Sequence, residues 1–121
     1  MSNVRTHMQR LLASELAELQ AAFADLLNYD SEDPTDPIDP LTYVAPDGDT
    51  CLHVAARRGN LRVVELLVKA GLNVNQPGDM GSTPLHCASA PEVIAFLLAS
   101  GASAQIQNEF GRYRVRDESA F

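Results

Sequence analysis

Apolar residues recur along residues 6–28 at the spacing expected for one face of an α-helix. The stripe advances in steps of four, three, four and three residues and consists of Leu12, Leu16, Leu19, Phe23 and Leu26. This pattern predicts a single amphipathic helix over residues 6–28. Thr6 and Gln9 have the spacing of a capping box at its start. The stripe must be buried, either against the rest of this chain or against a second protein.

The helical pattern stops at an acidic segment, residues 29–46. Between Asp30 and Pro40 the sequence contains five acidic residues, three prolines and no basic residue. Each proline disfavours helical backbone in the residue before it, so we expect an extended loop or linker. Apolar residues from Ile38 to Val44 could attach this loop to the body. The loop is interpreted either as a solvated connector or as a surface that recruits a basic ligand.

One pattern then occurs twice between Gly48 and Gly101. Five residues recur 33 positions later: Gly48, Thr50, Leu52, His53 and Ala55 are matched by Gly81, Thr83, Leu85, His86 and Ala88. Each copy predicts a turn followed by two helices, and a fixed period near 33 indicates a stacked array. The second copy lacks three residues between Ala88 and Pro91, so we expect its first helix to end early.

A third copy begins and then diverges. Gly101 to Gly111 repeats the ten-residue spacing of Gly71 to Gly81, but the residues after Gly111 lose the pattern. We expect a degenerate turn whose polar outer face covers the last repeat. Its basic residues are Arg112, Arg114 and Arg116.

The repeated segments resemble the ankyrin repeat family. The resemblance is carried by Thr83-Pro-Leu-His-Cys-Ala88, by Gly59 and Val63 four residues apart, and by Leu97-Leu-Ala-Ser-Gly101. It is close over Asp47–Asn75 and good over Asp79–Gln105. It implies an all-α solenoid of stacked turn-helix-helix units. We expect residues 1–28 to form an N-terminal capping helix, residues 29–46 a loop, and residues 47–121 the repeats with a degenerate C-terminal cap.

The resemblance also separates framework residues from contact residues. Thr50, His53, Thr83 and His86 are interpreted as side chains that brace the turns. The concave face and turn tips of the family bind proteins, which implies that the partner-binding residues are Asp47, Asp49, Arg57, Arg58, Asp79, Met80, Ser82, Glu109, Phe110 and Arg112.

The acidic net charge of the chain bears on which kinds of molecule it can bind. The formal net charge is −7 and the pI is near 4.7, whereas nucleic acids and anionic lipids are held by clustered Lys and Arg. We therefore expect neither nucleic acid nor membrane as a partner, and favour a protein with a basic surface. No run approaches the roughly 20 apolar residues of a membrane span. Two cysteines and no visible secretion signal predict a cytoplasmic location.

The sequence contains no recognisable catalytic or metal-binding motif. Cys51 with His53 and His86 with Cys87 superficially resemble a zinc set, but zinc needs four converging ligands. The repeat places the two histidines in parallel positions one repeat apart. We therefore expect a non-enzyme without cofactor or metal.

Three functions are compatible with these features. The first is a non-catalytic module that binds a partner protein. The second is a small cytoplasmic inhibitor or immunity-type protein that neutralises a basic toxin or enzyme. The third, from another class, is a structural homo-oligomer formed through the N-terminal helix, although we expect a monomer rather than a dimer.

Overall fold

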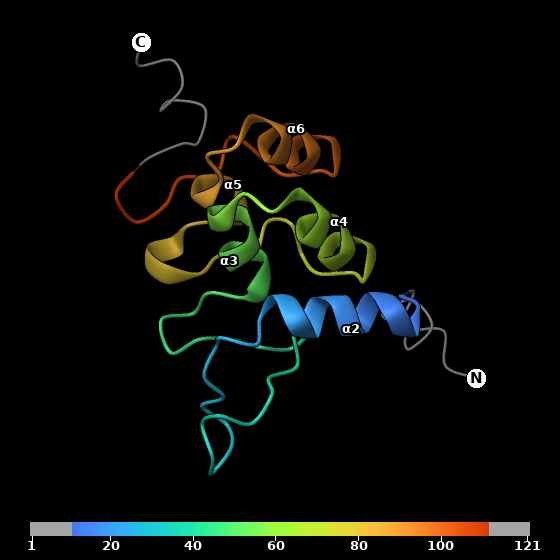
Figure 1. The fold of residues 1–121 in the computed structure, drawn as a ribbon. Coiled ribbons are helices and arrows are strands. Elements are labelled where there is room, and N and C mark those ends of the chain that lie inside the picture. The colour runs from blue at the N-terminus through green and yellow to red at the C-terminus, as the bar shows by residue number, and fades with distance from the viewer. Residues whose placement is uncertain (1–10, 112–121) are drawn as a thin grey trace, which may run out of the picture.

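The computed structural model describes residues 11–111. Within this range the elements are five α-helices and one short 3-10 helix: α2 (Ala13–Ala22), α3 (Cys51–Arg58), α4 (Leu61–Lys69), η1 (Asp79–Gly81), α5 (Pro84–Cys87) and α6 (Pro91–Ala99). Figure 1 shows α2, α4 and α6 stacked in one row, with α3 and α5 in a second row beside it. The turns project from the side of the second row. This is the all-α stacked array that the sequence predicts.

Each repeat begins with a turn that a threonine and a histidine brace. The Thr50 N–H donates to His53 Nδ1 at 3.0 Å, and the Thr83 N–H donates to His86 Nδ1 at 2.9 Å. The preceding glycine has positive φ, +102° for Gly48, where a side chain would strain the backbone. The structural role expected for these residues is confirmed.

Repeat two is shortened where the sequence lacks three residues. Helix α5 has four residues, whereas α3 has eight. Ala88 and Ala90 are extended, with ψ of 136° and 128°, so the chain passes directly from α5 to α6. The expected early end of this helix is confirmed.

The N-terminal helix is shorter than predicted, and the assignment of one helix to residues 6–28 is wrong within the described range. Leu12 is the extended N-cap, and the Leu12 N–H donates to Glu15 Oε1 at 2.9 Å. Phe23 leaves helical geometry, and the Leu26 N–H then donates to the Phe23 carbonyl in a turn. Leu26 still packs against the core, because a turn can keep apolar residues on the same side without helical backbone. The proposed cap at Thr6 and Gln9 lies outside the described residues.

Helix α2 covers one end of the array. Leu19 and Phe23 are fully buried in the core, and α2 lies against α4 as α4 lies against α6 (Figure 1). Two ion pairs border this contact, Glu15–Lys69 at 3.1 Å and Glu18–Arg62 at 3.0 Å. Helix α2 therefore occupies the place of the second helix of a preceding repeat.

The acidic loop enlarges the connection between α2 and the first turn. Between the end of α4 at Lys69 and the next turn glycine, Gly81, the chain advances 12 positions. Between the end of α2 at Ala22 and the first turn glycine, Gly48, it advances 26 positions. Asn28 holds the base of the loop, since its N–H donates to the Pro34 carbonyl at 2.9 Å and its Nδ2 donates to the Pro37 carbonyl at 3.0 Å. Ile38 is buried in the core, so the end of the loop is anchored to the array.

Candidate functional site

Three successive turns present equivalent residues at their tips. Asp47, Met80 and Phe110 each precede a turn glycine. Met80 is 50% exposed and Phe110 is 66% exposed, although turn tips are usually polar. Met80 also has φ of +56°, which is uncommon for a residue with a side chain. The second and third turns therefore place large apolar side chains in solvent at neighbouring positions.

Hydrogen bonds fix the tips relative to one another. The Glu109 N–H donates to the Met80 carbonyl at 2.8 Å. One turn earlier, the Asp79 N–H donates to Asp49 Oδ1 at 2.8 Å. The tips therefore form a connected row rather than three independent loops.

Asp49 belongs to this framework and not to the contact surface where the sequence analysis placed it. It is 4% exposed, and its second carboxylate oxygen accepts from Arg57 at 2.8 Å. Burial alone would raise the pKa of the Asp49 carboxyl. The Asp79 N–H and the Arg57 guanidinium outweigh burial and hold the pKa below its ordinary value. Asp49 is therefore a buried carboxylate that joins the first two turns.

His53 makes a second connection between the same turns. Its Nδ1 accepts from the Thr50 N–H, and its Nε2 lies 3.0 Å from the Ser82 carbonyl. This pattern fits a neutral ring with the proton on Nε2. Burial lowers the pKa of His53, although the Asp49 carboxylate opposes the shift. A Cβ at Gly78 would meet Asp49 and would lie 2.7 Å from His53 Nε2, so this junction requires glycine.

The two predicted contact arginines serve different parts of the fold. Arg57 is about half exposed and rests on Asp49 and on Cys87 Sγ, the latter at 3.4 Å. Arg58 turns toward the cap: it donates to the Ala22 carbonyl at 3.1 Å and to Asp25 at 2.7 Å, and it lies over the Phe23 ring. Arg58 thus ties α3 to α2 instead of lying among the tips.

The remaining predicted contact residues gather at the tips. Ser82 is half-buried, and its hydroxyl is 3.4 Å from Asn108 Nδ2. Arg112 lies outside the described residues. We define the tip surface as the charged and apolar members of the predicted set that stay wholly or partly exposed on the three turns: Asp47, Asp79, Met80, Glu109 and Phe110. This surface combines two large apolar side chains with three carboxylates.

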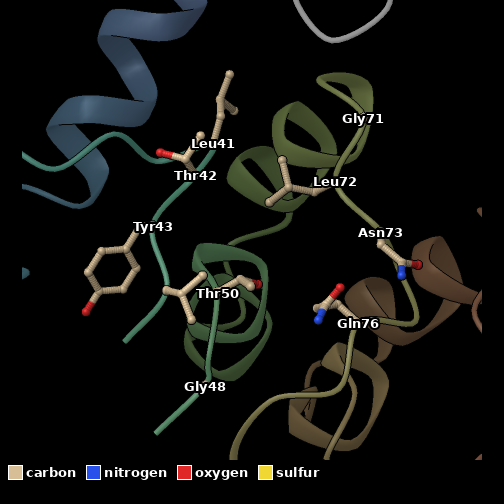
Figure 2. Close-up of a pocket in the computed structure, with 10 residues that line it drawn as sticks. Leu41, Thr42, Tyr43, Gly48, Thr50, Gly71, Leu72, Asn73 and Gln76 are labelled. Carbon is tan, nitrogen blue, oxygen red and sulfur yellow. The ribbon is translucent and has the colours of Figure 1, made fainter. Parts of the chain in front are cut away.

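A groove that the sequence analysis missed lies between the end of the acidic loop and the segment after α4. Its volume is about 310 Å³. Figure 2 shows Leu41 to Tyr43 on one side, Gly71 to Gln76 on the other, and the Leu72 side chain between them. A smaller cavity of about 260 Å³ lies on the other side of residues 42–44. No residue pattern within either segment marks this groove, because its two sides lie about 30 residues apart in the sequence.

The two cysteines of the repeats are wholly or partly shielded from solvent. Burial raises the pKa of the Cys51 thiol to about 12 and raises that of Cys87, so both favour the unreactive thiol. Neither cysteine is in a disulfide. Between residues 11 and 111, no three His, Cys, Asp or Glu side chains are grouped to hold a metal ion. No helix in that range is long and apolar enough to cross a membrane.

Comparisons with known proteins agree with the architecture. A family model described as ankyrin repeats (3 copies) matches residues 10–108. Protein phosphatase 1 regulatory subunit 27 from Homo sapiens is 38% identical over 74 residues, which are 59% of this chain and 48% of the relative. RelA-associated inhibitor from Mus musculus is 37% identical over 79 residues, 65% of this chain and 8% of the relative. E3 ubiquitin-protein ligase KEG from Arabidopsis thaliana is 36% identical over 76 residues, 60% of this chain and 5% of the relative. The chain thus spans about half of the first relative and less than a tenth of the other two.

Proposed function

Because the chain belongs to the ankyrin-repeat family, we propose that it is a non-catalytic module that binds a partner protein through the tip surface. The observation that most directly supports this proposal is the pair of exposed side chains Met80 and Phe110. Their turns are held one repeat apart by the backbone hydrogen bond between Glu109 and Met80. Aromatic residues and methionine are enriched at protein interfaces. Turns whose backbones are hydrogen-bonded to each other also lose less conformational entropy on binding than flexible loops.

The charges around this pair define the expected partner. Asp47, Asp79 and Glu109 are exposed or partly exposed on the same three turns as the apolar side chains, and the whole chain carries a net charge of −7. We expect a partner that presents an apolar side chain flanked by Lys or Arg. Rim charges mainly accelerate association and fix the register of the complex. Asp47→Asn with Glu109→Gln should therefore slow association and weaken its dependence on salt.

A regulatory or inhibitory role is a narrower form of the proposal. The names of two relatives, a protein phosphatase 1 regulatory subunit and a RelA-associated inhibitor, support control of another protein by binding. Protein phosphatase 1 is a first candidate to test. A cytoplasmic inhibitor of a basic toxin or enzyme stays within the same proposal, because it would use the same acidic surface.

The geometry favours a monomer over a homo-oligomer formed through the N-terminal helix. The buried side of α2 is occupied by α4, with Leu19 and Phe23 in the core and Glu15 and Glu18 in ion pairs. A dimer through this stripe would first have to remove α2 from the array. Sedimentation of the purified chain as a dimer would contradict this part of the proposal.

The test of the tip surface is a double variant, Met80→Asn with Phe110→Ser. Asparagine suits the positive φ of Met80, so the turn should persist. Leu98→Ser is a matched control, because Leu98 is 44% exposed on α6. Proteins captured by the wild type and by the control should be lost from the tip variant, as measured by quantitative mass spectrometry. Unchanged capture by a folded tip variant would refute the assignment.

A further inference from the structure

The smaller cavity beside residues 42–44 is formed by the acidic loop and the chain just before it. Its volume is about 260 Å³. Small-molecule sites usually measure roughly 300–1,000 Å³, so this cavity suits a single side chain better than a whole small molecule. Figure 2 shows the Tyr43 ring pointing away from Leu72, and Tyr43 lines this cavity. The tip residues do not line it, so the cavity is separate from the tip surface.

Two aromatic rings and two carboxylates are among the groups that line the cavity, namely those of Tyr29, Tyr43, Asp30 and Asp39. Burial, and after it the neighbouring Tyr29, raise the pKa of Tyr43, so its phenol stays uncharged at neutral pH. The Asp30 N–H donates to Asn28 Oδ1 at 3.0 Å, and Asp39 Oδ1 accepts from the Leu41 N–H at 3.0 Å. Both aspartates are exposed to solvent, so another molecule can reach them.

Another part of the chain shows what an aromatic ring and a carboxylate hold together. Arg58 lies over the Phe23 ring, 5.8 Å from its centroid, and donates to Asp25 Oδ2 at 2.7 Å. The face of the ring attracts the cation, and the carboxylate accepts a charge-assisted hydrogen bond from it. The planar guanidinium group makes both contacts at once. The cavity contains the same two kinds of group, each of them twice.

Within the described part of the chain, the cavity has no cation of its own. The basic residues of positions 11–111 are Arg57, Arg58, Arg62 and Lys69. Each of them pairs with an acid elsewhere, in the same order Asp49, Asp25, Glu18 and Glu15. Positions 11–56 contain neither lysine nor arginine. Within the described range, the carboxylates of Asp30 and Asp39 therefore have no ion-pair partner, and a cation from another molecule can pair with them.

We propose that this cavity binds an arginine side chain of a partner protein. The guanidinium group stacks on the tyrosine rings and donates to the carboxylates of Asp30 and Asp39, as Arg58 does with Phe23 and Asp25. Lysine is held less well, because its compact ammonium group cannot stack on a ring and bind a carboxylate through two parallel hydrogen bonds. The inference rests on the proposed function, namely that the chain binds a protein, but it does not depend on the tip surface. It gives the acidic loop the role of recruiting a basic ligand.

The direct test is an NMR titration of the full ¹⁵N-labelled chain with N-acetyl-arginine methylamide at constant ionic strength. The citrulline analogue, which has a similar shape but no charge, is the control. The arginine probe should shift the amide signals of Tyr29, Asp30 and Tyr43 in a saturable manner. Citrulline should bind roughly tenfold more weakly, because it forms neither the ion pairs nor the cation–ring contact. Equal responses to both probes, or no response to arginine, would overturn the proposal.

Two matched double variants separate the cavity from the overall charge of the loop. Asp30→Asn with Asp39→Asn should weaken binding of the arginine probe at least about fivefold. Asparagine keeps the oxygen that accepts from the Leu41 N–H, so the loop should persist. Glu32→Gln with Asp36→Asn removes the same charge from exposed positions that do not line the cavity, and it should bind the probe as the wild type does. An equal loss in both variants would refute the site.

The aromatic part of the site is tested at Tyr29, which is 58% exposed. Tyr29→Leu should weaken binding of the arginine probe more than Tyr29→Phe, because phenylalanine keeps a ring face for the cation. Equal binding by the two variants would contradict stacking on this ring. The tip variant, Met80→Asn with Phe110→Ser, should bind the probe as the wild type does, so failure of the tip surface and failure of the cavity are distinguishable.

Discussion

Repeat one and repeat two share a sequence framework but are held in the array by different means. His53 is fully buried, whereas His86 is half-buried. Asp49 is a buried carboxylate, and the residue 33 positions later is Ser82. Helix α4 lies between α2 and α6, so repeat one is covered on both sides. From this comparison we expect a repeat's contribution to stability to depend on its neighbours as well as on its own motif.

The largest effect should follow from removing the cover of repeat one. Deletion of residues 1–28 exposes α4 and removes Leu19 and Phe23 from the core. Each such side chain stabilises the fold by roughly 1.5–3 kcal/mol, and fewer than about three repeats rarely form a stable stack. We expect no cooperative thermal transition by circular dichroism. An unshifted transition would show that the two repeats are stable without α2.

The two histidines should differ in what their loss costs. His53→Ala removes a fully buried side chain with hydrogen bonds to two turns, which should lower the free energy of unfolding by about 3 kcal/mol. His86→Ala should cost clearly less, because its side chain is half-buried. Urea denaturation of both variants gives the comparison. Equal losses of unfolding free energy in the two variants would contradict the expectation that the more buried histidine contributes more to stability.

Asp49→Asn should cost about 2 kcal/mol, since it weakens charged hydrogen bonds to the Asp79 N–H and to Arg57. Ser82→Ala, at the matching position, should cost less than about 0.5 kcal/mol. Because the folded pKa of Asp49 is lowered, its stabilisation is present above the unfolded pKa near 4 and disappears as pH falls through the folded value. The difference between wild type and Asp49→Asn should therefore shrink in acid. A constant difference would contradict the ionised state of Asp49.

The smallest effect should be a pH dependence that His53 contributes. Its folded pKa lies below its ordinary value, so the unfolded chain takes up the proton first as pH falls. Stability should be full above pH of about 6.5 and should decline toward pH 5, by at most about 1.4 kcal/mol per pH unit. His53→Gln should flatten this decline when urea denaturation is followed between about pH 5 and pH 7. An unchanged profile in His53→Gln would assign the proton to another group.

Much of the array could be predicted from local residue patterns. Thr50 with His53 and Thr83 with His86 marked the turns because each pair acts within four residues. The missing residues before Pro91 predicted the short α5 for the same reason, as chain length between fixed points is a local property. The helix at 6–28 was overextended because Leu26 keeps the apolar spacing after Phe23 has left the helix. The spacing of apolar residues indicates which side of a segment is buried, and a turn can keep that spacing without helical backbone.

The sequence by itself determined the family, the repeat period and the residues that brace each turn. The tertiary structure decided which predicted contact residues remain available. Asp49 and Arg58 were assigned to contact by position, yet one is buried between turns and the other is bound to the cap. Asp79, which Asp49 binds in the next turn, and Asp25, which Arg58 binds in the cap, lie 30 and 33 residues away in the sequence, and packing brings such distant residues together. The groove is likewise formed by two segments that are distant in the sequence, the end of the acidic loop and the residues after α4, so only the folded structure reveals it.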